Sequence, residues 1–180
     1  MKSEQIKHHF ARMKSQRTSF YHDSGVDFTT PWRRPLPEKW SLGETFFHLL
    51  LMERLFRRFS YIYLPIMLPF AHLRKKKPYK TEIHNPYQDF QKKRKRPMKA
   101  PFLIVPPSRL EEKFTFEDIQ ALLEAETDKL KVQLRDMEEE VAGQIRYPDP
   151  VVDYPNLIQC IHLLAIHEQH HFNVTKKYLI

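Results

Sequence analysis

Apolar residues recur at steps of three and four through four long stretches of the chain, which is the period of an amphipathic helix. The first stretch covers about residues 3–20. Its apolar stripe consists of Ile6, Phe10, Met13 and Phe20. The second stretch begins at Ser41, which forms a capping-box pattern with Glu44. We expect this second helix to end before Pro65, because proline breaks helix interiors.

The third and fourth stretches have the same period and carry their own end signals. Thr115 and Asp118 form another capping-box pattern, and the apolar positions that follow them continue to Gly143. Glycine is common just after a helix, so we expect the third helix to stop there. Asp153 is a candidate cap for the fourth helix, with Pro155 tolerated in the first turn.

The chain offers little that could form a β-sheet. The best candidate strand, residues 102–105, is isolated and flanked by prolines. We therefore predict an all-α fold, a four-helix bundle, with residues 1–180 forming a single domain. One long connection, from about Pro65 to Ser108, joins the second helix to the third.

The composition is that of a folded protein with one unusual segment. Hydrophobic residues make up 41% of the chain and aromatic residues 13%, which excludes a disordered composition. The formal net charge is +8, but residues 74–99 alone hold eleven Lys or Arg against Glu82 and Asp89. The positive charge therefore belongs to this segment, the basic loop, and not to the domain as a whole.

No segment resembles a secretory signal or a membrane span. The polar N-terminus lacks the apolar region of a signal peptide. The most lipophilic stretch, residues 46–70, is interrupted by charged residues and prolines, whereas a span needs roughly 20 mostly apolar residues. With Cys160 as its one cysteine, the chain can form no internal disulfide, which suits a reducing compartment. We expect a cytoplasmic protein without a membrane partner.

Three histidines replace apolar residues on the inward stripes of two helices. His167 and His171 lie four residues apart, so they share one face of the last helix, with their Cβ atoms roughly 6 Å apart. His48 takes an inward position on the second helix. A lone inward histidine is more often a core residue with hydrogen-bond partners, but an inward pair favours a shared metal ion. The sequence thus predicts a metal site made of His48, His167 and His171.

Residues 167–171 also satisfy the H-E-x-x-H pattern of zinc proteases. In that mechanism the glutamate, here Glu168, activates a metal-bound water. A five-residue pattern has little specificity by itself, and the predicted lack of strands argues against a protease. The zinc protease therefore stays a remote alternative.

Two motifs, in their order along the chain, resemble the DinB-like (YfiT-type) superfamily. The first is the run 40–44, which leads to His48 and then Glu53, and the second is the closing run from His167 to His171. The resemblance implies a four-helix bundle, frequently dimeric, in which these three histidines bind nickel, zinc or a similar divalent ion. It also implies chemistry, because some members use or transfer low-molecular-weight thiols. The long basic loop departs from the family pattern.

The leading hypothesis is a protein that binds a divalent metal ion, with zinc or nickel favoured, and acts as a hydrolase or a thiol S-transferase on a small molecule. A metal-bound thiol loses its proton readily. This thiol would come from solution, because Cys160 is expected to be a buried core residue. No catalytic residue can be assigned from the sequence.

Two non-enzymatic alternatives stay open. The bundle could serve as a homodimeric scaffold, or the basic loop 74–99 could bind nucleic acid or another polyanion. Aromatic residues for stacking on bases lie close by at Tyr79, Tyr87 and Phe90. A charged run is more often a solvated loop, so nucleic acid is the less favoured partner.

Overall fold

The computed structural model of the protein describes residues 1–87, 100–149 and 152–179. Long helices in this part of the chain are α1 (Glu4–Tyr21), α2 (Leu42–Arg74), α4 (Phe116–Gln133) and α6 (Leu157–Leu179). Shorter turns of helix are η1 (Phe102–Ile104), η2 (Leu110–Glu112) and α5 (Glu139–Ala142). The described residues contain no strand, so the predicted all-α fold is confirmed, and the candidate strand at 102–105 is a 3-10 turn instead.

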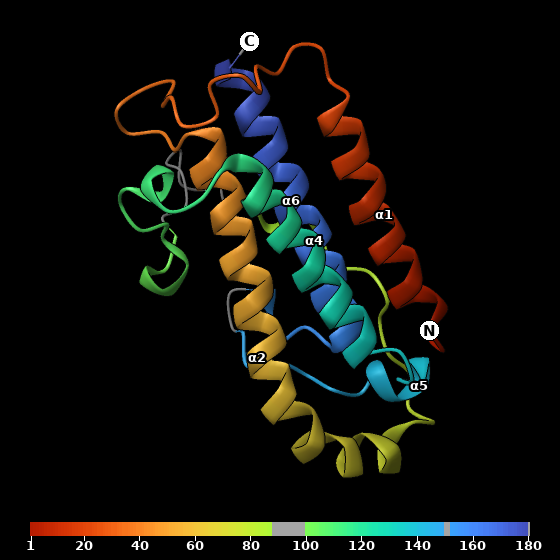
Figure 1. Ribbon diagram of the computed structural model, residues 1–180. Helices are drawn as coiled ribbons and strands as arrows, with labels where there is room; N and C mark the ends of the chain where they lie inside the picture. Colours follow the sequence, from red (N-terminus) through yellow and green to blue (C-terminus); the bar gives the residue numbers. More distant parts are fainter. Residues whose placement is uncertain (88–99, 150–151, 180) are drawn as a thin grey trace.

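The four long helices lie side by side along the length of the molecule (Figure 1). Helix α2 packs against α4, and α1 packs against α6. Helices α1 and α6 run in one direction, and α2 and α4 run in the other. Because α2 and α4 begin at the same end of the molecule, the chain between them has to return along its length. This return explains the long connection between the second and third long helices.

Helix α2 continues through Pro65 and Pro69 to Arg74, so the prediction that it ends before Pro65 is wrong. Proline lacks the backbone N–H and crowds the preceding turn, and α2 curves along this part of its length (Figure 1). The inner side of the same segment places Leu64 and Ala71 in the core. Burial of this apolar face offsets the hydrogen bonds that the prolines remove.

Helix α4 ends at Gln133, so the prediction of one helix that reaches Gly143 is also wrong. The chain turns there and forms α5 as a separate short helix at the end of the bundle (Figure 1). Leu134, Met137 and Val141 are nevertheless all buried in the core. The apolar period therefore runs across the turn, although the helix does not.

The capping boxes predicted at Ser41 and at Thr115 are both present. The last helix is capped differently from the prediction. Asn156 N–H donates to Gln159 Oε1 and Gln159 N–H donates to Asn156 Oδ1, both at 3.0 Å, just before and within the first turn of α6. Asp153 lies in the preceding turn with a φ of 56°, so its prediction as the helix cap is wrong.

The connection between α2 and η1 contains the basic loop. Of its residues, 75–87 are described, whereas 88–99 lie outside the described residues. The basic run 92–96 and Phe90 belong to that second part. Among the described helices, none combines the length and the apolar character needed to cross a membrane.

Candidate metal centre

The three histidines singled out by periodicity meet between α2 and α6. One nitrogen from each of His48, His167 and His171 lies within 4.8 Å of the others. The ring centroids are 4.7 Å apart for the two pairs that include His171, and 5.1 Å apart for His48 and His167. His48 and His167 are buried, and His171 is half-buried. Side chains 119 residues apart in the sequence are thus brought to one point.

The proton of His48 is held on the side that faces away from this point. His48 Nδ1 lies 2.6 Å from the backbone oxygen of Ile104, in η1. A carbonyl oxygen can only accept a hydrogen bond, so Nδ1 carries the proton and donates it. The lone pair of neutral His48 is therefore on Nε2, which lies 3.0 Å from His167 Nε2.

His167 has a partner of its own on the outer side of its ring. Its Nδ1 lies within hydrogen-bond distance of the hydroxyl of Tyr87, a residue from the described part of the basic loop. The Tyr87 ring also stacks on His170, with centroids 4.3 Å apart and an interplanar angle of 10°. Tyr87 therefore belongs to this centre and is not a free surface for stacking on nucleic-acid bases.

An indole ring covers the remaining histidine. Trp40 stacks against His171 with a centroid distance of 6.2 Å and packs against His48 at 4.8 Å. Within the described part of the chain, the His171 side chain has ring contacts but no hydrogen bond. The nitrogens of His171 are therefore not engaged by other described side chains.

Burial keeps these imidazoles neutral. It lowers the pKa of His48, and together with the neighbouring histidines it lowers the pKa of His167 to about 3. The pKa of His171 is lowered well below its ordinary value, first by burial and then by His167 and His48. Neutral imidazole is the form that binds metal ions. Three nitrogen donors suit zinc, nickel and other first-row divalent ions, and three protein ligands leave a position open.

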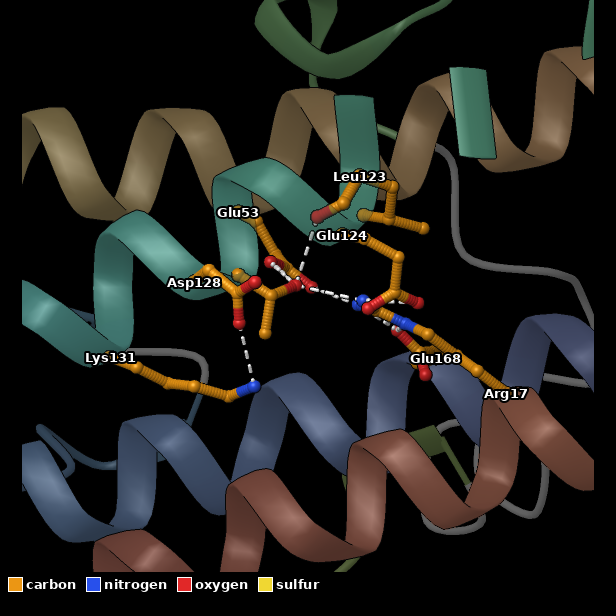
Figure 2. A network of polar contacts seen from close by, with 8 residues as sticks. Arg17, Glu53, Leu123, Glu124, Asp128, Lys131 and Glu168 are labelled. Carbon is orange, nitrogen blue, oxygen red and sulfur yellow. Dashed lines mark hydrogen bonds and ion pairs between the residues drawn. The ribbon is translucent and has the colours of Figure 1, made fainter. Parts of the chain in front are cut away.

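A buried polar network, which includes the residue after His167, joins all four long helices (Figure 2). Its centre is Arg17 of α1, whose side chain is 2% exposed. Arg17 Nε and Nη2 donate to Glu168 Oε2 of α6 at 2.9 and 2.7 Å, and Nη2 also donates to Glu53 of α2 at 2.5 Å. Arg17 Nη1 donates to Thr127 Oγ1 of α4 at 2.8 Å.

This network engages the glutamate of the H-E-x-x-H pattern. The Glu168 carboxylate forms a buried ion pair with Arg17, and burial raises the pKa of Glu168 to about 7. Both bonds from Arg17 go to Oε2 of Glu168 and hold α6 against α1, whereas Glu168 Oε1 is buried without a hydrogen-bond partner in the described part of the chain. The zinc-protease alternative stays a prediction.

Two other residues of α6 with metal-binding side chains, His162 and Cys160, have different surroundings. His162 is buried, stacks on His9 with centroids 4.4 Å apart and lies 3.1 Å from Arg12. Cys160 is a buried free cysteine whose pKa is raised by burial, as expected for a core residue. Neither Tyr87 nor the carbonyl of Ile104 could be assigned from sequence patterns. Arg17 could have been, because it takes the place of an apolar residue on the stripe of α1.

Comparison with models of protein families identifies the family of this chain. No curated protein and no solved structure matches the chain. The family model described as the DinB superfamily matches residues 31–174, which include His48, His167 and His171. Because this match covers most of the chain and all three converging histidines, the protein belongs to the DinB superfamily.

Proposed function

We propose that this protein binds one divalent metal ion through His48, His167 and His171. The observation that carries the proposal is the convergence of three imidazole nitrogens within 4.8 Å at a largely buried point. The tautomer of His48 supports it, because the Ile104 carbonyl leaves the Nε2 lone pair directed inward. The low pKa values of His167 and His171 support it further. At neutral pH these rings are uncharged, so a metal ion does not have to displace a proton to bind them.

The proposed role is that of an enzyme acting on a small molecule, either a thiol S-transferase or a hydrolase. A bound zinc or nickel ion supplies a Lewis acid that favours the deprotonated form of a coordinated thiol or water. The protein contributes three ligands and an open position, and the rings of Trp40 and Tyr87 pack against the ligands. The thiol would be a soluble one, since Cys160 is buried in the core.

The direct test is metal content after purification without an affinity tag, because a tag can itself introduce nickel. We expect about one equivalent of zinc or nickel per chain in the wild-type protein. We expect a large loss of metal in His48→Ala, His167→Ala and His171→Ala, because each removes one of three ligands. His72→Ala is the matched control, since His72 is an exposed histidine on α2. Unchanged metal content in all three ligand variants would refute the site.

Activity is tested separately from binding. Metal-loaded protein is mixed with a low-molecular-weight thiol and an alkylating electrophile, and the disappearance of the thiol is followed against the same concentration of free metal. Faster consumption that His48→Ala abolishes supports S-transfer. Consumption at the rate of the free metal would rule out this reaction while leaving metal binding intact.

A homodimer is the second proposal, and α2 carries the observation that favours it. Its outer face exposes an apolar stripe at steps of three and four: Leu55, Phe59, Ile62, Ile66, Phe70 and Leu73. Ile62 is 69% exposed and Leu73 is 87% exposed. A large side chain has about 150–200 Å² of surface, and between 42% and 87% of each of these six is exposed. The exposed part of the stripe is therefore roughly 600 Å², close to the surface of about 800 Å² that each partner of a stable dimer buries. Helical spacing favours another helix as the partner, and a two-fold axis would pair the stripe with its copy.

Light scattering coupled to size-exclusion chromatography tests the dimer. The wild-type protein should elute with twice the mass of the 21.8 kDa chain. Ile62→Glu and Ile66→Glu should shift it to the monomer, because a charge would be buried in the interface. Val132→Glu is the control, since Val132 is also exposed but lies on α4, outside the stripe. A monomeric wild-type protein would contradict the proposal.

A further inference from the structure

Part of the long connection runs along α6 and is held by side chains of that helix. We call this part, residues 77–87, the strap. Asn156 Nδ2 donates to the Lys80 backbone oxygen at 2.7 Å, and Gln159 Nε2 donates to the Glu82 backbone oxygen at 2.7 Å. Two side-chain amides, one just before α6 and one in its first turn, thus donate hydrogen bonds to the strap backbone.

The strap follows α6 toward the three-histidine cluster. After the two amides, the Ile83 N–H lies 3.3 Å from His162 Nδ1, and at the end of the strap Tyr87 reaches His167. An extended chain advances about 3.3 Å per residue and a helix about 1.5 Å, so a short strap can pass several turns of α6. Its polar contacts with α6 therefore continue along the helix as far as His167.

The last residue of the strap is fixed on three sides. The Tyr87 N–H donates to Asn85 Oδ1 at 3.0 Å, which closes a tight turn. The phenol ring stacks on His170, and the hydroxyl contacts His167 Nδ1. The hydroxyl is therefore aimed at the outer nitrogen of a proposed ligand, while the inner nitrogen of that ligand faces His48.

We propose that Tyr87 is a positioning residue of the metal centre, and that metal binding and docking of the strap are coupled through it. The inference rests on the proposed metal function. When Nε2 of His167 binds a metal ion, Nδ1 has to keep its proton, and the Tyr87 oxygen is the acceptor within reach. Such a hydrogen bond is compatible with the binding tautomer, because a phenol hydroxyl can accept as well as donate, and it holds the ring in the orientation that points Nε2 inward.

The coupling works in both directions. If the docked strap raises the affinity for the metal by some factor, the metal stabilises the docked strap by the same factor. Metal binding should therefore slow hydrogen exchange of backbone amides in residues 77–87. A tyrosine that only fills space beside His170 would produce no such link.

Tyr87→Phe tests the role of the hydroxyl, because it keeps the ring that stacks on His170 and removes one oxygen atom. The matched control is Tyr79→Phe on the same strap. The Tyr79 ring packs closely on Gly143, where an added Cβ would lie 2.3 Å from the ring, and not on the histidines. Zinc affinity is measured by competition with a chromophoric chelator. We expect Tyr87→Phe to bind zinc about 10–100-fold more weakly than the wild-type protein. Tyr79→Phe should keep the wild-type affinity.

Hydrogen exchange measured by mass spectrometry gives the second readout. Zinc should slow exchange in peptides from the strap of the wild-type protein, and this effect should shrink in Tyr87→Phe. Either of two results would overturn the role of Tyr87. One is a zinc affinity of Tyr87→Phe equal to that of the wild-type protein, and the other is strap hydrogen exchange that zinc does not change in the wild-type protein. If the wild-type protein takes up no metal at all, the proposed metal function itself fails, so the two failures are distinguishable.

Discussion

Single residues at the heart of the molecule are polar where the helical pattern calls for apolar side chains. His48 and His167 interrupt the inward stripes of α2 and α6, and Arg17 interrupts that of α1. Each of these side chains has a polar partner at its buried position, because an unpaired polar group in a core is costly. The ion pairs of Arg17 with Glu53 and Glu168 hold the helices that present the histidines.

Replacing Arg17 by methionine should destabilise the protein strongly. The change leaves Glu53 and Glu168 buried without their cation, and breaking a buried pair in this way costs about 3–5 kcal/mol. Urea unfolding monitored by circular dichroism gives the free energy of unfolding. Arg58→Met, at an exposed position of α2, should change it little. A loss below about 1 kcal/mol in Arg17→Met would contradict a structural role for the network.

At the scale of elements, two side chains at the start of α6 both cap the helix and bind the strap. Asn156 Oδ1 accepts the Gln159 N–H at the start of the helix, while Asn156 Nδ2 holds the strap at Lys80. Gln159 likewise accepts a backbone N–H with one end of its amide and binds the strap with the other. The start of the helix and the course of the strap are therefore set together.

Helix α2 joins two regions that the sequence separates. Its first turns carry His48, and its extension beyond Pro65 carries half of the exposed apolar stripe proposed for dimerisation. Burial stabilises the extension, because Ala71 lies in the core and Met67 and Leu68 pack against it. A helix ending before Pro65 would not present Ala71 to the core and would leave the stripe without half of its residues.

Protonation of one buried histidine should lower the stability of the protein in mild acid. Burial, followed by His162, His8 and Arg12, lowers the pKa of His9 from its ordinary value of 6.5 to about 4. Above pH 6.5 the ring is neutral in both the folded and the unfolded chain, so it has no effect on stability. Between pH 6.5 and 4 the unfolded chain binds a proton that the folded chain does not, so the free energy of unfolding falls as the pH decreases.

Urea unfolding of metal-free protein across this pH range measures the effect. His9→Leu cannot be protonated, so its free energy of unfolding should decline less steeply than that of the wild-type protein, with a difference of about 1–3 kcal/mol near pH 4. His72→Ala, which alters an exposed histidine, should follow the wild-type curve. Parallel curves for His9→Leu and wild type would show that His9 is not the group responsible.

Local signals in the sequence were sufficient for the all-α class, for the capping boxes at Ser41 and Thr115, and for the inward faces that carry His48, His167 and His171. These features depend on residues within a turn or two of each other, and helical geometry relates such residues directly. The same local signals were misleading where burial overrides them. Proline at 65 does not end α2, and an unbroken apolar period does not make α4 and α5 one helix.

Only the tertiary structure decided what surrounds the histidines. The Ile104 carbonyl, Trp40 and the strap with Tyr87 reach the cluster from segments that carry no periodic signal. The pairing of Arg17 with Glu53 and Glu168 likewise depends on three helices meeting. Sequence determines which face of a helix is inward, because that is a property of neighbouring residues. Which distant groups meet at that face is set by how the helices and the long connection pack, since contacts between remote segments exist only once the chain is folded.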